Sequence, residues 1–426
     1  ARVGALAVAG DNIVIGGDFT STGSINSNRI AKWNPSSNSW SALGSGMDHS
    51  VSDVAVSGSD IYAAGRFKMA GGAAANHIAK WNGTSWSNLG DGTDFPVSAI
   101  AIDGQDVFAA GIFSTAGGTA VNGIAKWDGN RWSALGNGIT SPPLGLYNVN
   151  AVAVDANHHV FIGGNFRAVD GVSASNVAKW NGSSWQALGS GVNSIVNDIA
   201  IDGDKLYVGG AFTLAGGNSA NRIAVWDISG ESWSEIGGGV DNQVFSIVPQ
   251  NNGFVISGNF TTAGGVNANR IARWDGSNWS SFGSGVDASA LALAIHNGDV
   301  FVGGLFTTAG GKPSFKFAHW TDMTTAIDEI AEIPHDYVLQ QNHPNPFNPS
   351  TKISYQLPFA SQVTLTVFDR LGRQVATLVD GQQPAGKHEL RFDASALTSG
   401  VYFYRLSATT STGQQFAQTR KLMLLK

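Results

Sequence analysis

The chain has 426 residues, with 55 glycines, 13 tryptophans and no cysteine, and only 13% of its residues are charged. The missing cysteine excludes disulfides and thiolate metal sites, and no apolar run reaches the ~18 residues of a membrane-spanning helix. Residues 337–426 carry a net charge of +5 and the rest carries −11, which excludes nucleic acid as an expected partner.

The sequence begins with Ala1 and shows no leader. We therefore expect a signal peptide upstream of Ala1, and an extracellular or outer-surface location.

A repeated phrase fills the first three quarters of the chain. Gly-Gly-x-Phe is followed by Asn-Arg-Ile-Ala-x-Trp, and the Trp lies 14 residues after the Phe in all seven copies. The period of 46 to 53 residues is typical of four-stranded propeller blades. We expect these aromatic residues to pack the blades together: Phe19, Trp33, Phe67, Trp81, Phe113, Trp127, Phe166, Trp180, Phe212, Trp226, Phe260, Trp274, Phe306 and Trp320.

Each copy predicts four strands joined by tight turns. In the sixth copy Arg270–Trp274 and Trp279–Phe282 flank Asp275-Gly276, a pair that favours a two-residue hairpin turn. The Gly-Gly pairs suggest close backbone approach near the central axis, and their second position is Gly in every copy. A recurring Asn, five residues before the Trp in five copies, is expected to bond to backbone: Asn28, Asn76, Asn122, Asn221 and Asn269.

This pattern resembles the kelch family and its bacterial relatives. The shared features are the Gly-Gly pair at a strand end and an aromatic residue followed by a Trp. In the family the Trp comes six residues later, and here the intervals are Trp81 to Trp86 in the second copy and Trp33 to Trp40 in the first. The resemblance implies a seven-bladed β-propeller over residues 1–322, and it says almost nothing about function.

The seventh copy lacks the second Trp that the other six carry. Three sources could supply its outer strand: residues upstream of Ala1, the segment Thr324–Ile333, or a neighbouring molecule that pairs with the open edge.

A different pattern begins after a linker at 323–336. Short alternating strands are separated by turn residues, which predicts an immunoglobulin-like β-sandwich of about seven strands over 337–426. The expected strands are Lys352–Leu357, Gln362–Phe368, Gln374–Leu378, His388–Phe392, Val401–Ala408 and Phe416–Leu425.

This segment closely resembles the type A sorting domain of the type IX secretion system. The resemblance covers about 90 residues, and it implies export by the type IX machinery, followed by release or surface attachment. The matching phrases include Asn345, Pro346, Phe347, Asn348, Pro349, Gly372, Gly400, Tyr402, Lys421 and Lys426.

We find no pattern that indicates catalytic, cofactor-binding or metal-binding residues. The nine histidines are scattered, and His158-His159 is interpreted as part of a polar turn. Asp103, Asp202, Asp204 and Asp299 also fall at expected turns, where Asp is common for structural reasons. The tryptophans are more simply explained by blade packing than by sugar binding.

These features favour a non-enzymatic surface protein that binds a glycan or protein ligand or has a structural role. The insertion before the fourth copy is the candidate contact loop: Pro142, Pro143, Leu144 and Tyr147. One alternative is a subunit that self-associates into an oligomer, extracellular filament or sheath. A second alternative is a polysaccharide hydrolase or lyase with acids in the central channel or on one face.

Overall fold

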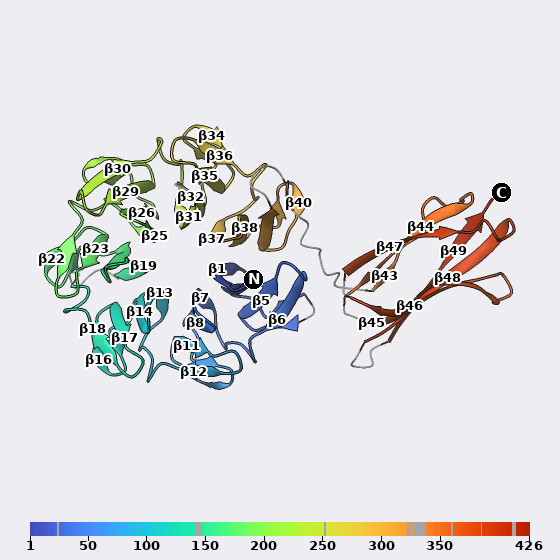
Figure 1. Ribbon diagram of the computed structural model, residues 1–426, viewed down its shortest axis with the longest axis horizontal. Helices are drawn as coiled ribbons and strands as arrows, with labels where there is room; N and C mark the ends of the chain where they lie inside the picture. The colour runs from blue at the N-terminus through green and yellow to red at the C-terminus, as the bar shows by residue number, and fades with distance from the viewer. Residues whose placement is uncertain are drawn as a thin grey trace. The chain divides into compact units, whose positions relative to one another are not determined.

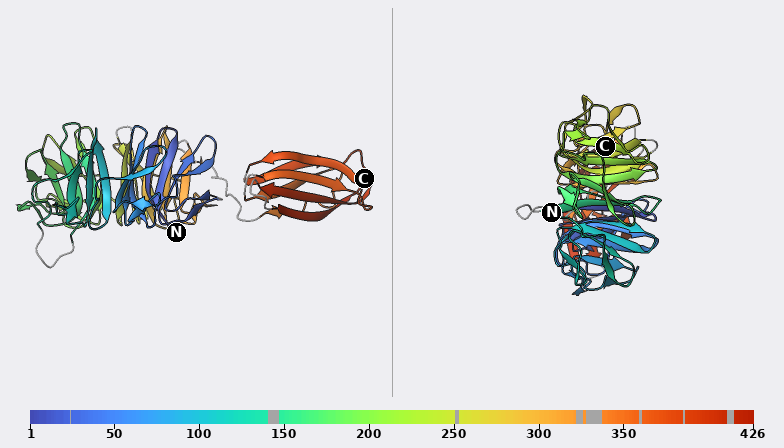
Figure 2. Two further views of the ribbon diagram at one scale, coloured as in Figure 1. Left: turned by 90° about the horizontal axis from the view of Figure 1, so that it is seen from below. Right: turned by 90° about the vertical axis from the view of Figure 1, so that its left-hand side faces the viewer.

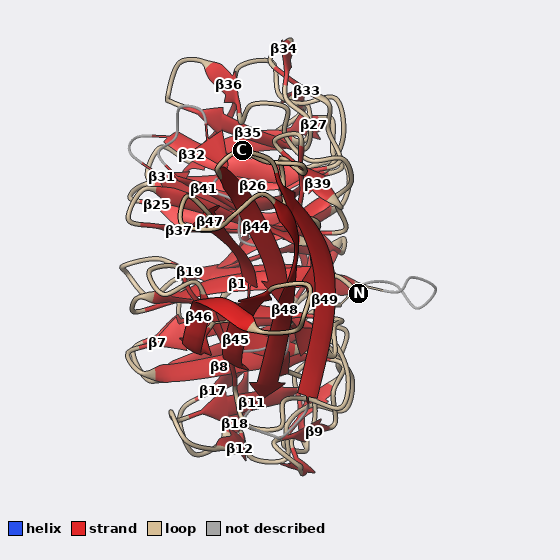
Figure 3. Ribbon diagram, turned by 90° about the vertical axis from the view of Figure 1, so that its right-hand side faces the viewer, coloured by secondary structure: helices blue, strands red, loops and turns tan. Residues whose placement is uncertain are grey.

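The computed structural model describes residues 1–23, 25–140, 147–250, 253–321, 326–327, 337–358, 361–384, 386–410 and 415–426. The chain forms two compact units, which are described separately. One contains Ala1–Thr22 and Asn26–Ile330, and the other contains Ala331–Lys426 with Gly23–Ile25. The described residues form strands, turns and loops, without a helix that could cross a membrane (Figure 3).

The first unit is a ring of seven antiparallel four-stranded sheets (Figure 1). Blade 1 has the order β1-β2-β5-β6, and the other six blades repeat it. This result confirms the all-β, seven-bladed prediction.

The four strands of a blade run from the ring centre to its rim. The inner strands are β1 (Val3–Ala9), β7 (Val51–Ser57), β13 (Val97–Asp103), β19 (Asn148–Val154), β25 (Val196–Asp202), β31 (Val244–Gln250) and β37 (Ala290–His296). The second strands are β2 (Asn12–Gly17), β8 (Asp60–Gly65), β14 (Asp106–Gly111), β20 (Val160–Asn165), β26 (Lys205–Gly210), β32 (Gly253–Gly258) and β38 (Asp299–Gly304). The third strands are β5 (Ile30–Asn34), β11 (Ile78–Trp81), β17 (Ile124–Trp127), β23 (Val177–Trp180), β29 (Ile223–Asp227), β35 (Ile271–Trp274) and β41 (Phe317–Thr321). The outer strands are β6 (Ser39–Ala42), β12 (Trp86–Asn88), β18 (Trp132–Ala134), β24 (Trp185–Ala187), β30 (Ser232–Glu235), β36 (Trp279–Ser281) and β42 (Ala326–Ile327).

Each blade also carries a small two-stranded hairpin between its second and third strands, which the four-strand prediction missed. In blade 2 the Gly71-Gly72 turn joins the two strands, and both glycines have positive φ, as a type I′ turn requires. The hairpins are β3/β4 (Ser21–Thr22, Ile25–Asn26), β9/β10 (Met69–Ala70, Ala73–Ala74), β15/β16 (Thr115–Ala116, Thr119–Ala120), β21/β22 (Ala168–Val169, Val172–Ser173), β27/β28 (Leu214–Ala215, Asn218–Ser219), β33/β34 (Thr262–Ala263, Val266–Asn267) and β39/β40 (Thr308–Ala309, Lys312–Pro313).

The antiparallel order gives the ring two different faces (Figure 2). One face, called here the hairpin face, carries the small hairpins and the connections between blades. The opposite turn face carries the tight turns between the first and second strands and between the third and fourth strands. Long connections therefore gather on one face only.

The two positions of the Gly-Gly pair have different neighbours. A Cβ built on Gly210 would collide with the carbonyl oxygen of Ile195 in the same blade. The expected close backbone approach is thus confirmed at the second position, but it occurs on the second strand of the blade and not at the central axis. A Cβ on Gly209 would instead meet the Val244 side chain of the next blade. Because a side chain can shift, other blades carry Ala64, Ala110 or Ser257 at that first position.

The core of the ring consists of seven apolar clusters, each at a joint between neighbouring blades. The cluster at the joint between blades 7 and 1 contains Val3, Trp33, Phe301 and Phe317. The outer strand of blade 7 is β42, which pairs with β41 through Trp320↔Ile327 and Thr321↔Ala326. Of the three expected sources, the segment Thr324–Ile333 therefore supplies this strand, inside the stretch expected to be a linker.

The second unit is a sandwich of two antiparallel sheets with seven strands, as predicted. One sheet has the order β43-β44-β47 and the other has the order β46-β45-β48-β49. Tyr355 and Tyr404 lie fully buried in the core between them. The strands are β43 (Val338–Leu339), β44 (Ser350–Leu357), β45 (Ser361–Phe368), β46 (Gln374–Gln383), β47 (Gly386–Asp393), β48 (Gly400–Thr410) and β49 (Gln415–Leu424).

Candidate functional site

The structure places the repeated aromatic residues at the joints between blades. All seven Phe side chains are buried, including Phe67, Phe113 and Phe212 with no exposed area. Trp33, Trp81, Trp226 and Trp320 are buried, whereas Trp127, Trp180 and Trp274 are only half-buried. Part of the indole is therefore exposed at three of the seven positions.

In five blades the second Trp makes a hydrogen bond to the backbone at the end of the preceding blade. The indole Nε1 of Trp86 donates to the Leu43 carbonyl at 2.8 Å, and that of Trp132 donates to the Leu89 carbonyl at 2.8 Å. The same bond recurs from Trp185, Trp233 and Trp279. These residues act in blade assembly, because their only polar group is already engaged.

The recurring Asn side chains bond to backbone, as predicted. Their Nδ2 atoms donate to the carbonyls of Ser45, Asp91, Asn137, Gly238 and Ser284 at 2.9 to 3.1 Å. The next residue has positive φ in all seven blades, although it is glycine only at Gly123. Arg or Lys, which do not favour positive φ, occupies most of these seven positions, so the sequence alone could not predict this conformation.

The sequence analysis missed a second set of side chains that bond to backbone. Asp287 lies in the connection to blade 7 and accepts hydrogen bonds from the backbone N–H groups of Thr307 and Thr308 at 2.7 and 3.0 Å. Asp48, Asp94, Asn193 and Asp241 do the same in other blades. The signal was visible as a Gly-x-Asp or Gly-x-Asn phrase at the end of most repeats.

The central channel contains a cavity of about 310 Å³ that all seven inner strands line. Polar side chains line it on blades 2 to 5, including Ser52, Ser98, Asn150 and Asn197. Blades 6, 7 and 1 contribute mainly apolar side chains, including Phe245, Leu291 and Leu6, with Ser246 of blade 6 as a polar exception. Polar groups are therefore concentrated on blades 2 to 5.

Two aspartates in this channel link neighbouring blades. Asp53 accepts hydrogen bonds from the N–H groups of Val54 in its own strand, at 2.8 Å, and Ile100 in blade 3, at 2.7 Å. Asp198 does the same with Ile199 at 2.8 Å and Ile247 of blade 6 at 2.7 Å. Burial raises the pKa of Asp53 to about 6 and that of Asp198 to about 7, although these hydrogen bonds oppose the shift.

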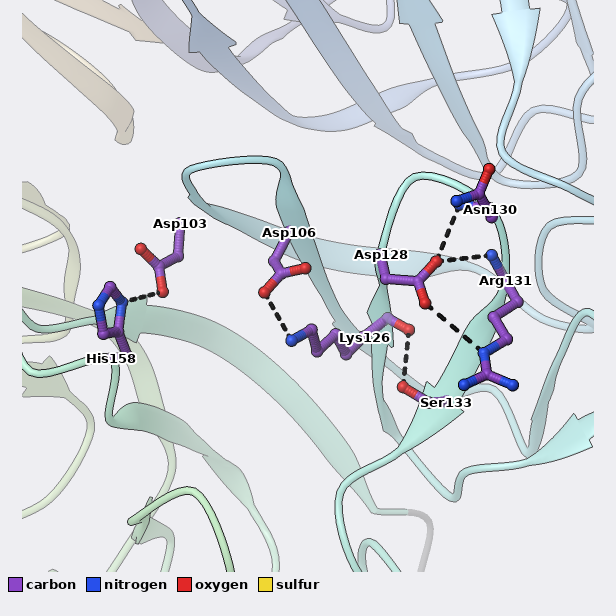
Figure 4. A network of polar contacts seen from close by, with 8 residues as sticks. All are labelled: Asp103, Asp106, Lys126, Asp128, Asn130, Arg131, Ser133 and His158. Carbon is purple, nitrogen blue, oxygen red and sulfur yellow. Dashed lines mark hydrogen bonds and ion pairs between the residues drawn. The ribbon is translucent and has the colours of Figure 1, made fainter.

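A second cavity, of about 580 Å³, lies at the joint between blades 3 and 4. Its polar groups form part of the network in Figure 4, where Asp103 contacts His158 at 2.6 Å and Asp106 contacts Lys126 at 2.5 Å. His158 and His159 lie in a turn, as expected, and each contacts an aspartate. Within the part of the chain that the structure describes, no group of three or more His, Asp or Glu side chains could hold a metal ion.

The candidate contact loop is described only at its end. Pro142, Pro143 and Leu144 lie outside the described residues. Tyr147 is half-buried on the hairpin face, and its hydroxyl contacts the Phe113 carbonyl at 3.4 Å. The exposed side chains of Phe95 and Ile112 lie on the same face, in connections of the same blade as Phe113.

The sorting-domain phrases, far apart in sequence, meet at one end of the sandwich. Phe347 is buried, its N–H donates to the Met423 carbonyl at 3.0 Å, and its carbonyl accepts from Leu425 at 2.9 Å. Asn345 accepts a hydrogen bond from the Met423 N–H at 2.9 Å. Three of the remaining residues of these phrases make hydrogen bonds to nearby residues: Pro349 with Ala394, Tyr402 with Thr398 and Lys426 with Ser395. The others lie in the same loop (Pro346 and Asn348), in a turn (Gly372), at the start of β48 (Gly400) and in β49 (Lys421).

Comparison with known families agrees with both units. Residues 2–154 and 139–290 match the model of the Rax2 C-terminal beta propeller domain. Residues 342–422 match the model of the secretion system C-terminal sorting domain. This second match confirms the sorting-domain resemblance, and the protein is exported by type IX secretion to the cell surface or the extracellular space.

Solved structures show the fold alone, because their identities are low. The extracellular domain of BT3049 from B. thetaiotaomicron is 10% identical with a TM-score of 0.50, and the match covers 99% of this chain and 55% of that one. The chain thus spans about half the length of that relative. The computationally designed protein Ika8 is 17% identical with a TM-score of 0.49, over 83% of this chain and 93% of the design. The comparison with curated proteins found no match.

The propeller model covers about two thirds of the sequence, from residue 2 to residue 290. The protein therefore belongs to the family of the Rax2 C-terminal beta propeller domain and carries a type IX sorting domain.

Proposed function

We propose that the propeller is a non-enzymatic recognition module of the cell surface, which binds a protein partner through its hairpin face. The observation that carries this proposal is the distribution of exposed apolar side chains. All the exposed large apolar side chains among the described propeller residues lie in connections of the hairpin face: Met69, Phe95, Ile112, Ile195, Leu214, Val266, Leu305 and Phe315.

The turn face has the opposite character. Among the described residues its turns carry twelve acidic residues, and the connections of the hairpin face carry seven. The twelve are Asp11, Asp60, Asp103, Asp106, Asp128, Asp155, Asp202, Asp204, Asp227, Glu231, Asp275 and Asp299, and the seven are Asp18, Asp48, Asp91, Asp94, Asp170, Asp241 and Asp287. Aromatic and aliphatic groups gather at protein interfaces, whereas acidic groups are depleted there. The hairpin face is therefore the better protein-binding surface.

Blade 3 is the best point at which to test this face. Phe95 is 56% exposed and Ile112 is 41% exposed, and the Ile112 N–H bonds to the carbonyl of Pro96, the residue after Phe95. The two side chains thus come from adjoining backbone segments. Together they form an apolar contact that two substitutions can remove.

The test uses fluorescently labelled full-length protein and intact cells of the producing bacterium, measured by flow cytometry. We expect the Phe95→Ser/Ile112→Ser double variant to bind at least tenfold more weakly, and Arg131→Ala on the turn face to bind like the wild type. Protease treatment of the cells should abolish binding, and periodate should not. Unchanged binding by the double variant, or no binding by the wild type, would overturn the proposal.

A polysaccharide hydrolase is the second candidate, because the raised pKa of Asp198 is a property that a general acid needs. Against this role, Asp53 and Asp198 already accept two backbone N–H groups each. The described residues that line the cavity include no His, Lys, Arg or Tyr. Release of reducing sugar from a polysaccharide panel that is lost in Asp198→Asn would favour the hydrolase over the recognition module.

Self-association into a filament was the other role that the sequence suggested. One observation in its favour was that the seventh blade looked incomplete in the sequence. The structure removes this argument, because β42 of the same chain supplies the outer strand of that blade. We therefore place this role behind recognition. A monodisperse monomer in light scattering across concentrations would be consistent with this order.

A further inference from the structure

The cavity between blades 3 and 4, called here the interblade cleft, has no part in the proposed recognition by the hairpin face. Its volume of about 580 Å³ lies within the range of small-molecule sites. Blade 3 contributes Asp103, Asp106, Phe108 and Lys126 to its lining, and blade 4 contributes His158 and Trp180. The lining thus combines apolar surface with groups that can donate and accept hydrogen bonds.

A lengthened turn places a polar group over this joint. Five residues separate β19 from β20 in blade 4, whereas two residues separate β13 from β14 in blade 3. The longer turn carries His158 at a φ of 62°, and its Nδ1 lies 2.6 Å from Asp103 Oδ2 in the neighbouring blade. His158 and Asp103 therefore face each other across the joint (Figure 4).

The Asp106–Lys126 ion pair supplies further hydrogen-bonding groups to the cleft. The two side chains are 30% and 35% exposed and lie 2.5 Å apart. Asp60 and Lys80 form the same pair in blade 2 at 2.7 Å, with the same exposures, but they are not among the residues that line this cleft. Blade 2 therefore contains a matched control for any role of the pair in ligand binding.

Trp180 provides an apolar wall. It lines the cleft and is only half-buried, as Trp127 and Trp274 also are, whereas the Trp at the same position in the other four blades is buried. The face of an aromatic ring is negative and attracts weakly positive C–H groups. An indole next to carboxylates and an ammonium group suits a ring with C–H groups on its face and hydroxyls at its edge.

We propose that the interblade cleft binds a pyranose sugar residue. Trp180 contacts the face of the ring, and Asp103, Asp106, Lys126 and His158 hydrogen-bond its hydroxyls. A free anion is disfavoured by the two carboxylates, and a simple cation is disfavoured by Lys126. None of the exposed apolar side chains that carry the recognition proposal lines the cleft, so the two proposals can be tested separately.

The test uses the purified full chain on a printed array of bacterial-surface and plant oligosaccharides, followed by calorimetric titration of the best ligand. We expect Asp106→Asn and His158→Ala each to weaken binding at least tenfold, and Asp60→Asn to leave it unchanged. His158 is 76% exposed, so its removal should not disturb the fold. Trp180→Phe should keep part of the affinity and Trp180→Leu should lose it.

Three results would overturn the proposal. The wild type could bind no oligosaccharide on the array. Asp60→Asn could weaken binding as much as Asp106→Asn, which would show a general effect on stability. Finally, the ligand could bind His158→Ala and Trp180→Leu with wild-type affinity, which would place the sugar elsewhere.

Discussion

At the scale of single residues, Asp53 and Asp198 give the propeller a distinctive pH dependence. Burial raises their pKa values to about 6 and about 7, from an ordinary value of 3.8. Between about pH 4 and pH 7 the folded chain therefore binds more protons than the unfolded chain, and stability falls as the pH rises. We expect the melting temperature to fall from pH 5 to pH 8, and the Asp53→Asn/Asp198→Asn variant to show a flatter profile by calorimetry.

Asp287 provides the control for that experiment, because its pKa shifts in the opposite direction. Burial opposes the shift, but hydrogen bonds from Thr308 and Thr307 outweigh it and lower the pKa of Asp287 to about 2. Its stabilising contribution is present above about pH 3.8 and is lost as the pH falls toward 2. Asp287→Asn should thus lower stability by a constant amount above about pH 4 and change the slope of the profile only on the acid side. Equal slopes for the double variant and the wild type between pH 5 and pH 8 would contradict our assignment.

The two positions of the Gly-Gly pair should differ in their tolerance of a methyl group. A Cβ on Gly210 collides with a backbone carbonyl, whereas one on Gly209 meets the movable side chains of Val244 and Ile247. We expect Gly210→Ala to cost about 3 kcal/mol in the free energy of unfolding and Gly209→Ala about 1 kcal/mol. Urea titration of the two variants measures this difference, and equal costs would refute the explanation.

At the scale of elements, β42 is the strand on which completion of blade 7 depends. It has two residues, whereas the other outer strands have three or four. Without it, the edge of β41 is open and can pair with another molecule. We expect a chain that ends at Thr321 to melt several degrees below one that ends at Asp336, and to associate in light scattering. Identical melting temperatures would show that β42 adds nothing to the ring.

Sequence patterns predicted the blade strands but not the hairpins, for a physical reason. Strand patterns need about four to eight alternating residues, and β9 and β10 have two residues each. Their turn, Gly71-Gly72, repeats in most copies and was the available signal. The contacts of Asp53 with Ile100 and of His158 with Asp103 could not be predicted, because each joins residues about 50 positions apart that meet only when neighbouring blades pack.

At the scale of the whole molecule, each unit has its own core. The sandwich core is built from residues between Leu339 and Leu424, and the cluster at the joint between blades 7 and 1 ends at Phe317. The ring also closes without residues of the sandwich, because β42 ends at Ile327. We therefore expect a chain that ends at Asp336 to melt within about 2 °C of the propeller transition of the full chain in calorimetry.

The same truncation separates folding from export. Residues 342–422 match the sorting domain, so a chain that ends at Asp336 should fold but should not reach the surface of the producing cell. Cell fractionation and surface labelling measure this, with Arg131→Ala in the full chain as the exported control. A truncated chain that reached the surface would show that the propeller carries an export signal of its own. A truncated chain that failed to fold would instead show that closure of the ring depends on the sandwich.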